Sequence, residues 1–261
     1  MDEKELLFTR VLQCGRADLY LDRKRKLDKS ETCVISKTLK RRARGEPLDY
    51  ILGSSEFMGL EFKINKDVLI PRPETEILVE AVLKNASCPA GHMSRCSILE
   101  IGTGSGCIAV SLAKILPHAQ ITATDISEAG LRVAKENARL HAVSHKINFI
   151  RCDLFPVRGA YKLIVSNPPY IPTADIKKLQ PEIQYEPRLA LDGGKDGLEF
   201  HRRIIKQAPA YLEKEGLLIL EIGFDQHERV LKILEQSQDF KLKEAIKDYN
   251  NISRVIVAVK T

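Results

Sequence analysis

Short apolar runs typical of β-strands alternate with helical patterns from residue 97 to the end of the chain. Strands are expected at 97–101, 121–124, 147–150, 163–165 and 217–222, and then, with no helix between them, at 242–246 and 255–259. Strands separated by helices pair in parallel, with helices on both faces, whereas two consecutive strands pair antiparallel. The sequence therefore predicts an α/β fold with a mostly parallel seven-stranded sheet and antiparallel terminal strands. Helices are expected at 73–82, 108–116, 127–140, 200–212 and 230–234.

The first fifth of the chain differs from the rest in charge. Residues 1–48 carry 13 basic and 8 acidic side chains, which is most of the net charge of +6. They contain no proline before Pro47, and their apolar residues recur at helical spacing. We expect a small helical domain at 1–48, a β-hairpin connector at 49–72 and a larger domain at 73–261. The basic face can bind nucleic acid or a protein partner, or it can simply be solvated.

Several classes of protein are not indicated. The longest uncharged apolar runs are far shorter than the roughly 18 residues of a membrane span. The charged start Met1-Asp2-Glu3-Lys4-Glu5 lacks the apolar core of a secretion signal, so a cytoplasmic location is expected. Neither a metal site nor a disulfide framework is predicted, because no C-x-x-C pair is present among the six cysteines, Cys14, Cys33, Cys88, Cys96, Cys107 and Cys152.

A glycine-rich loop joins the strand at 97–101 to the helix that follows it. A chain that reverses direction beside a ligand needs positive φ and no Cβ in the way, which glycine provides. The spacing differs from the G-x-G-x-x-G pattern of nicotinamide-binding loops, and an acid lies two residues before the first glycine. That acid favours a cationic ligand over a diphosphate. Cofactor contacts are therefore expected at Glu100, Gly102, Thr103, Gly104, Ser105 and Gly106.

Acidic residues also end the second and third predicted strands. Asp125 is placed where a ribose diol is held by two hydrogen bonds, and Asp153 can accept from an adenine amino group while Leu154 lines the base. Each acid has a simpler alternative: Asp125 can cap the helix that begins near Ser127, and Asp153 can stabilise a turn. Ligands of open α/β sheets bind at such strand ends, and the sulfonium nucleoside S-adenosylmethionine fits this chemistry.

The fourth predicted strand breaks into Asn167-Pro168-Pro169-Tyr170. Two prolines remove two backbone donors, so the Pro168 carbonyl is free to face the crevice. The side-chain oxygen of Asn167, this carbonyl and the flat ring of Tyr170 match a planar amide or amino group. Two neutral acceptors can aim the lone pair of such a nitrogen at a methyl carbon, and positioning then supplies most of the acceleration. The alternative is a rigid proline turn that only ends the strand.

Longer segments carry a family resemblance. Asn-Pro-Pro-Tyr after a fourth strand is similar to the signature of amino-methyltransferases that act on adenine or on glutamine. The segments GEPLDYILG at 45–53, VLIPRPETE at 68–76 and YEPRLALDGG at 185–194 are more discriminating. Together they resemble the bacterial peptide chain release factor N5-glutamine methyltransferases, a family of class I, Rossmann-like enzymes. The resemblance spans residues 45 to about 260, while residues 1–44 match only in size and helical character.

The resemblance implies a substrate and a donor. The acceptor would be the glutamine of the Gly-Gly-Gln tripeptide in class 1 release factors, and the methyl donor would be S-adenosylmethionine. By similarity the donor contacts Gly102–Gly106, Asp125, Leu154 and Asn167, although family members often carry an aromatic residue at the position of Leu154. The glutamine would lie against Asn167, Pro168, Pro169 and Tyr170, with Asn167, Pro168 and Tyr170 as the catalytic residues. The N-terminal helices would grip the release factor, and neither a membrane nor direct DNA binding is expected.

Three other interpretations remain open. An adenine N6-methyltransferase presents the same site, but it usually needs a broad basic cleft, and residues 49–261 carry 28 basic and 27 acidic side chains. A methyltransferase for a glutamine of a ribosomal protein would use the same residues. A silent adaptor would bind RNA through its basic helices and use the sheet as a scaffold. Arg72 and Glu186 can form an ion pair that closes the site or can contact substrate, and no role is assigned to Glu74.

Overall fold

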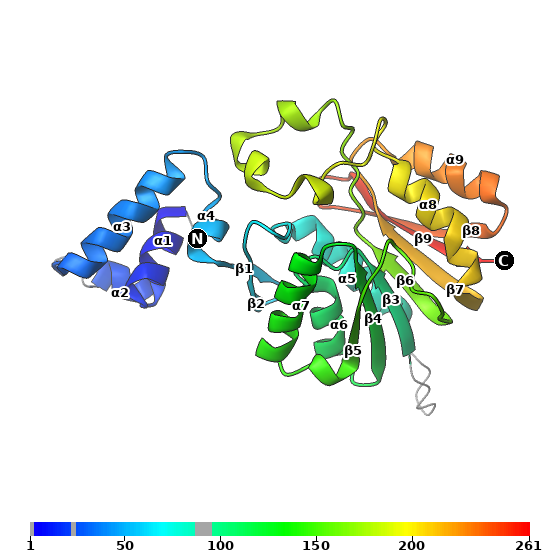
Figure 1. The fold of residues 1–261 in the computed structure, drawn as a ribbon, viewed down its shortest axis with the longest axis horizontal. Coiled ribbons are helices and arrows are strands. Elements are labelled where there is room, and N and C mark those ends of the chain that lie inside the picture. Colours follow the sequence, from blue (N-terminus) through cyan, green and yellow to red (C-terminus); the bar gives the residue numbers. More distant parts are fainter. Residues whose placement is uncertain (1–2, 22–24, 87–95) are drawn as a thin grey trace.

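The computed structural model describes residues 3–21, 25–86 and 96–261 (Figure 1). Four helices come first, α1 Glu3–Leu12, α2 Arg16–Leu21, α3 Lys29–Arg42 and α4 Leu48–Leu52, followed by the strands β1 Ser54–Phe57 and β2 Leu60–Lys63. The remaining helices are α5 Pro73–Ala86, α6 Cys107–Ile115, α7 Glu128–Leu140, α8 Glu199–Gln207 and α9 His227–Ser237. The remaining strands are β3 Cys96–Ile101, β4 Ala119–Asp125, β5 Ile147–Arg151, β6 Tyr161–Ser166, β7 Leu212–Glu221, β8 Phe240–Lys247 and β9 Ser253–Lys260.

These last seven strands form one sheet in the order β5-β4-β3-β6-β7-β9-β8. The pairs from β5 to β7 are parallel, and β9 is antiparallel to both β7 and β8. The predicted sheet is therefore confirmed, including its antiparallel terminal strands. From β3 the chain first proceeds to one side, through β4 and β5, and then returns to the other side, through β6 and β7. Such a reversal leaves a crevice beyond the carboxyl ends of β3, β4 and β6.

The sheet is buried on both faces. Ile98, Leu163 and Ile219 belong to an apolar cluster with α5 and α6, whereas the adjacent residues Leu99, Ile164 and Leu218 pack with α8 and α9. Figure 1 shows these helices on opposite faces of the sheet. Because successive side chains of a strand point to opposite faces, covering both faces favours apolar residues at most positions of the central strands. This is why the central strands are continuous apolar runs in the sequence.

The N-terminal helices have a separate apolar centre, made by Leu7, Ile35 and Leu48. They lie at one end of the molecule, beside the segment at 176–190 that contains three short 3₁₀ turns (Figure 1). Arg42 forms an ion pair with Glu182 of that segment at 3.0 Å. The predicted hairpin is present as β1 and β2, paired antiparallel. The division at residues 48 and 72 stays a prediction.

One predicted helix is wrong at its end. Residues 200–212 were expected to be helical, but α8 ends at Gln207, a 3₁₀ turn covers Ala208–Ala210, and β7 begins at Leu212. Pro209 lacks the N–H that a continuing α-helix needs. None of the described helices is long and apolar enough to cross a membrane.

Candidate active site

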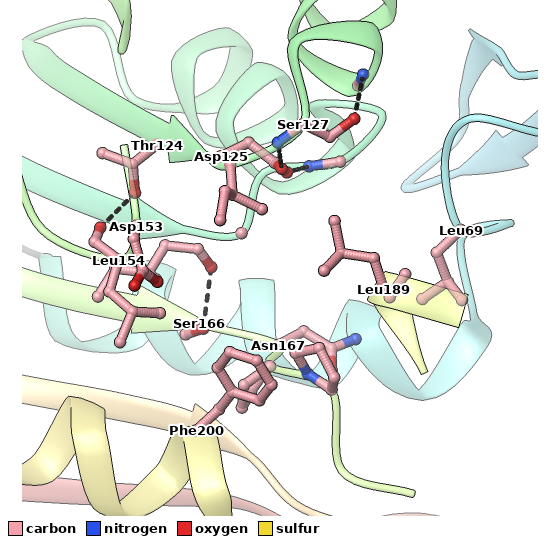
Figure 2. A pocket seen from close by; sticks show the side chains of 18 of the residues that line it. Leu69, Thr124, Asp125, Ser127, Asp153, Leu154, Ser166, Asn167, Leu189 and Phe200 are labelled. Atoms are coloured by element: carbon pink, nitrogen blue, oxygen red, sulfur yellow. Dashed lines mark hydrogen bonds between the residues drawn. The ribbon is translucent and has the colours of Figure 1, made fainter. Parts of the chain in front are cut away.

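A cavity of about 240 Å³ lies at the carboxyl ends of β3, β4 and β6. Figure 2 shows side chains from both halves of the sheet around it, with Asp125 and Ser127 on one side and Asn167 and Phe200 on another. It is lined by many of the residues singled out from the sequence, namely Gly102, Gly104, Asp125, Asp153, Leu154, Asn167, Pro168 and Pro169. Strand ends far apart in the sequence thus meet at one cavity, as the topology predicts.

The three glycines of the loop after β3 have two different roles. Gly102 and Gly104 have φ of 76° and 52°, and a Cβ added to either would meet no atom within 4 Å. They line the cavity, so a side chain at either position would occupy the space that a ligand needs. Gly106 has φ of 80°, but a Cβ there would lie 3.0 Å from the Cβ of Ala134. Gly106 therefore lets α6 approach α7 and does not line the cavity.

Asp125 holds this loop from the end of β4. One carboxylate oxygen accepts from the Gly104 N–H and the other from the Ser127 N–H, both at 2.8 Å. Burial raises the pKa of Asp125, and the backbone hydrogen bonds oppose that rise. The side chain that caps α7 is Ser127, whose Oγ accepts from the Gly130 N–H at 3.0 Å. Each oxygen of Asp125 keeps a further acceptor site, so the carboxylate can also take hydroxyl protons from a ligand.

Glu100 lies beneath the loop and does not line the cavity. Its Oε2 accepts from the Thr103 hydroxyl at 2.7 Å, and its Oε1 has no partner among the described residues. Burial raises the pKa of Glu100 to about 7, against the effect of the Thr103 hydrogen bond. Thr103 and Ser105 are also buried and outside the cavity lining. The contacts of Glu100, Thr103 and Ser105 with a cofactor stay predictions.

The part of the cavity wall near the end of β5 includes an aromatic residue, Phe200 of α8, that the sequence did not indicate. Asp153 is largely exposed and forms an ion pair with Arg203 of α8 at 2.6 Å. The Arg203 guanidinium lies 5.6 Å from the centre of the Phe200 ring, and Phe200 faces the cavity in Figure 2. The aromatic surface near Leu154 therefore comes from α8. An apolar residue on an amphipathic helix usually belongs to the core, so no sequence signal separates Phe200 from core residues.

The Asn-Pro-Pro-Tyr segment presents two acceptors at the cavity. The Nδ2 of Asn167 donates to the Thr75 hydroxyl at 3.0 Å. No described residue donates to the Oδ1 of Asn167 or to the Pro168 carbonyl, so both can bind a ligand. Tyr170 is half-buried and is not among the lining residues. Burial raises the pKa of Tyr170 above its ordinary value of 10, so its phenol stays protonated.

The matched segment at 185–194 supports this motif through its backbone. Ile171 donates to the Leu191 carbonyl at 3.0 Å, and Gly193 donates back to the Ile171 carbonyl at 2.8 Å. A Cβ on Gly193 would lie 2.8 Å from the Pro169 oxygen. Only glycine permits this approach, because such a distance is well inside van der Waals contact.

An ion pair joins the connector to the segment at 185–194. Arg72 is hydrogen-bonded to Glu186, and the same carboxylate accepts from the Ile70 N–H at 3.3 Å. Leu69 of the connector and Leu189 of the 185–194 segment both line the cavity, and Figure 2 shows their side chains near each other. The ion pair of the first alternative for Arg72 and Glu186 is therefore present, and its role in closing the site stays a prediction.

Comparisons with known proteins agree with this geometry. A family model of the methyltransferase small domain matches residues 73–183, and one of the PrmC N-terminal domain matches residues 2–53. The release factor glutamine methyltransferase of Geobacter sulfurreducens is 44% identical over 97% of this chain and 87% of its own. That of Coxiella burnetii is 42% identical over 98% of this chain and 90% of its own.

The chain belongs to the release factor glutamine methyltransferase family. A methyltransferase from Pyrococcus furiosus has the same fold, with a TM-score of 0.56 and 20% identity over 86% of this chain and 98% of its own. The described residues hold no group of three His, Cys, Asp or Glu side chains that could bind a metal ion.

We expect Glu186→Gln to lower the free energy of unfolding by about 1.5–3 kcal/mol, because the Arg72 guanidinium loses its charged partner in a largely buried setting. Urea unfolding of Glu186→Gln, Arg72→Ala and the double variant would measure this. The matched control is Glu182→Gln, whose partner Arg42 is shared with Glu3. An additive double variant would show that the two side chains do not interact.

Proposed function

We propose that this chain transfers the methyl group of S-adenosylmethionine to the side-chain amide nitrogen, N5, of the glutamine in the Gly-Gly-Gln motif of class 1 peptide chain release factors. One observation carries the proposal. Asn167 and Pro168 line the same cavity as Gly102, Gly104 and Asp125, and no described residue donates to the Asn167 Oδ1 or to the Pro168 carbonyl. The names of the relatives supply the substrate.

The cavity suits the methyl donor. Gly102 and Gly104 leave open space beside the loop, Asp125 offers acceptors for ribose hydroxyls, and Leu154 with Phe200 offers an apolar slot for a base. When bound, S-adenosylmethionine supplies an electrophilic methyl group on a sulfonium. The buried carboxylate of Asp125 favours such a cationic ligand. Glu100, Thr103, Ser105 and Gly106 would act on the donor indirectly, because they fix the conformation of the loop that contacts it.

The residues after β6 would prepare the acceptor nitrogen. Asn167 Oδ1 and the Pro168 carbonyl each accept one N–H of the glutamine amide, which orients its lone pair toward the methyl carbon. Tyr170 and Pro169 would limit how the amide can rotate. No strong base is needed before attack, because the nitrogen becomes acidic only as it is methylated. Positioning of this kind can account for most of the barrier reduction.

The partner would meet both parts of the chain. The basic helices of residues 1–48 would grip a release factor while the tripeptide enters the cavity, with residues 49–72 as connector and 73–261 as catalytic domain. Release factors act on ribosomes, so we place the enzyme in the cytoplasm, without direct contact to DNA or membrane. The deciding test is incubation with labelled S-adenosylmethionine and a purified class 1 release factor, followed by mass mapping of the Gly-Gly-Gln peptide. Label on a ribosomal protein or on nucleic acid instead would contradict the proposal.

Asn167→Ala should abolish methyl transfer and leave the affinity for S-adenosylmethionine within about tenfold, because the lost acceptor contacts mainly the substrate. Single-turnover transfer and calorimetry with the donor measure the two quantities. An equal loss of both would move Asn167 to a cofactor-binding role.

Asp125→Ala should weaken the binding of S-adenosylmethionine by roughly 1–3 kcal/mol, since two hydrogen bonds to the ribose are lost. Ser127→Ala is the matched control, because it removes the cap of α7 and keeps the carboxylate. Calorimetric titration of both variants separates the two effects. If Asp125→Ala binds the donor as well as the wild type does, Asp125 has only a structural role.

A further inference from the structure

A buried carboxylate lies directly behind the Asn-Pro-Pro-Tyr motif. Ser166 pairs with Leu220 in the register of β6 and β7, so the next residues, Asn167 and Glu221, lie at the same level of neighbouring strands. Glu221 is 1% exposed, and its Oε2 has no hydrogen-bond partner among the described residues. Burying a carboxylate costs free energy, so a residue placed here calls for a function that offsets this cost.

The hydroxyl of Thr75 connects Glu221 to Asn167. Thr75 is 2% exposed at the start of α5, and its Oγ1 accepts from the Asn167 Nδ2 at 3.0 Å. Burial raises the pKa of Glu221 to about 7, and hydrogen bonding with Thr75 opposes that rise. A hydroxyl has one proton to donate. If Thr75 donates that proton to Glu221, its oxygen can only accept from Asn167.

This arrangement decides which way the Asn167 amide faces. The oxygen and nitrogen of an asparagine side chain occupy nearly equivalent positions, and the hydrogen-bond network determines their order. With Nδ2 bound to Thr75, only Oδ1 is left for the cavity. In the opposite orientation Nδ2 would face the N–H groups of the glutamine amide, and two donors would oppose each other.

Glu221 also reaches the other end of the motif. Burial dominates the raised pKa of Glu221, and hydrogen bonding with Tyr170, whose protonated phenol is a donor, opposes that rise slightly. The backbone of Glu221 is itself held, because its carbonyl is 2.9 Å from the Nε2 of buried His201. Burial lowers the pKa of His201 to about 4, so the imidazole is neutral and donates from Nε2. The carboxylate therefore has a rigid support.

We propose that Glu221 is a positioning residue for methyl transfer: through Thr75 it fixes the Asn167 amide with Oδ1 toward the acceptor nitrogen, and it holds Tyr170 directly. This inference rests on the proposed function, since it assigns to Glu221 and Thr75 the orientation that the acceptor amide requires. Neither residue lines the cavity.

The main test is Glu221→Gln, which keeps the size of the side chain and adds a donor beside Thr75. Thr75 can then donate to Asn167, and the amide loses its fixed orientation. We expect kcat for a release factor to fall about 10- to 100-fold, with less than about threefold change in KM and in the affinity for S-adenosylmethionine. Glu213→Gln, at the exposed amino end of the same strand, is the matched control and should leave kcat unchanged.

Two variants of Thr75 test the connection without altering the carboxylate. Thr75→Ser keeps the hydroxyl and should retain kcat within about threefold, whereas Thr75→Val removes it and should lose kcat as Glu221→Gln does. In the Thr75→Val background, Glu221→Gln should cost a smaller factor than in the wild type, because part of its effect passes through Thr75. If Glu221→Gln does not fold, the contrast between serine and valine decides.

The outcomes separate this inference from the proposed function. If the wild type methylates a release factor and Glu221→Gln has wild-type kcat, Glu221 has no positioning role while the proposed function stands. Equal activity of Thr75→Ser and Thr75→Val, or a loss confined to KM, would likewise overturn the inference. If the wild type methylates no release factor, the proposed function itself fails.

Discussion

The site depends on the parallel pairing of β6 with β3 on one side and with β7 on the other. Because all three strands run in the same direction, the glycine loop, Asn167 and Glu221 leave the sheet at one edge. The pairing register is held by apolar side chains that alternate between two buried faces. A slip of one residue would exchange the faces of every side chain in the strand. Because such a slip would cost much free energy, the register fixes where the glycine loop, Asn167 and Glu221 lie along the edge of the sheet.

The Asn-Pro-Pro-Tyr segment is held by backbone and side-chain groups from several distant segments. The Asn-Pro-Pro-Tyr segment has few backbone donors of its own, since two of its four residues are prolines. Support comes instead from Gly193, from Gln226, whose side chain donates to the Tyr170 carbonyl at 2.8 Å, and from Thr75. A proline-rich turn held from outside leaves the Pro168 carbonyl free for a ligand, which a strand in a regular ladder would not.

The sequence predicts those parts of the site that are local in the chain. The glycine loop, Asp125 and Asn167 each follow an apolar strand, and the order of strands places them together. Phe200, Thr75 and Glu221 were missed, because their roles arise from contacts between elements: Asn167 and Thr75 are 92 positions apart. Glu221 follows a strongly apolar strand and resembles an ordinary strand end. The predicted end of α8 was wrong because the helical spacing of the apolar residues was given more weight than the helix-breaking effect of Pro209.

The placement of Glu221 behind neutral groups has a consequence for the chemistry. A carboxylate that accepted directly from the substrate amide would hold its N–H groups more strongly than an asparagine oxygen does. It would also attract the sulfonium of a bound donor, and an ion pair there would compete with the amide for the same oxygens. Glu221 does not line the cavity, so in the proposed arrangement it orients Asn167 and Tyr170 while the acceptors for the substrate amide stay uncharged. The charge that does line the cavity near the glycine loop, Asp125, lies on the side where the ribose is expected. Attraction for the cationic donor and orientation of the neutral acceptor are thereby assigned to different carboxylates, at the ends of different strands.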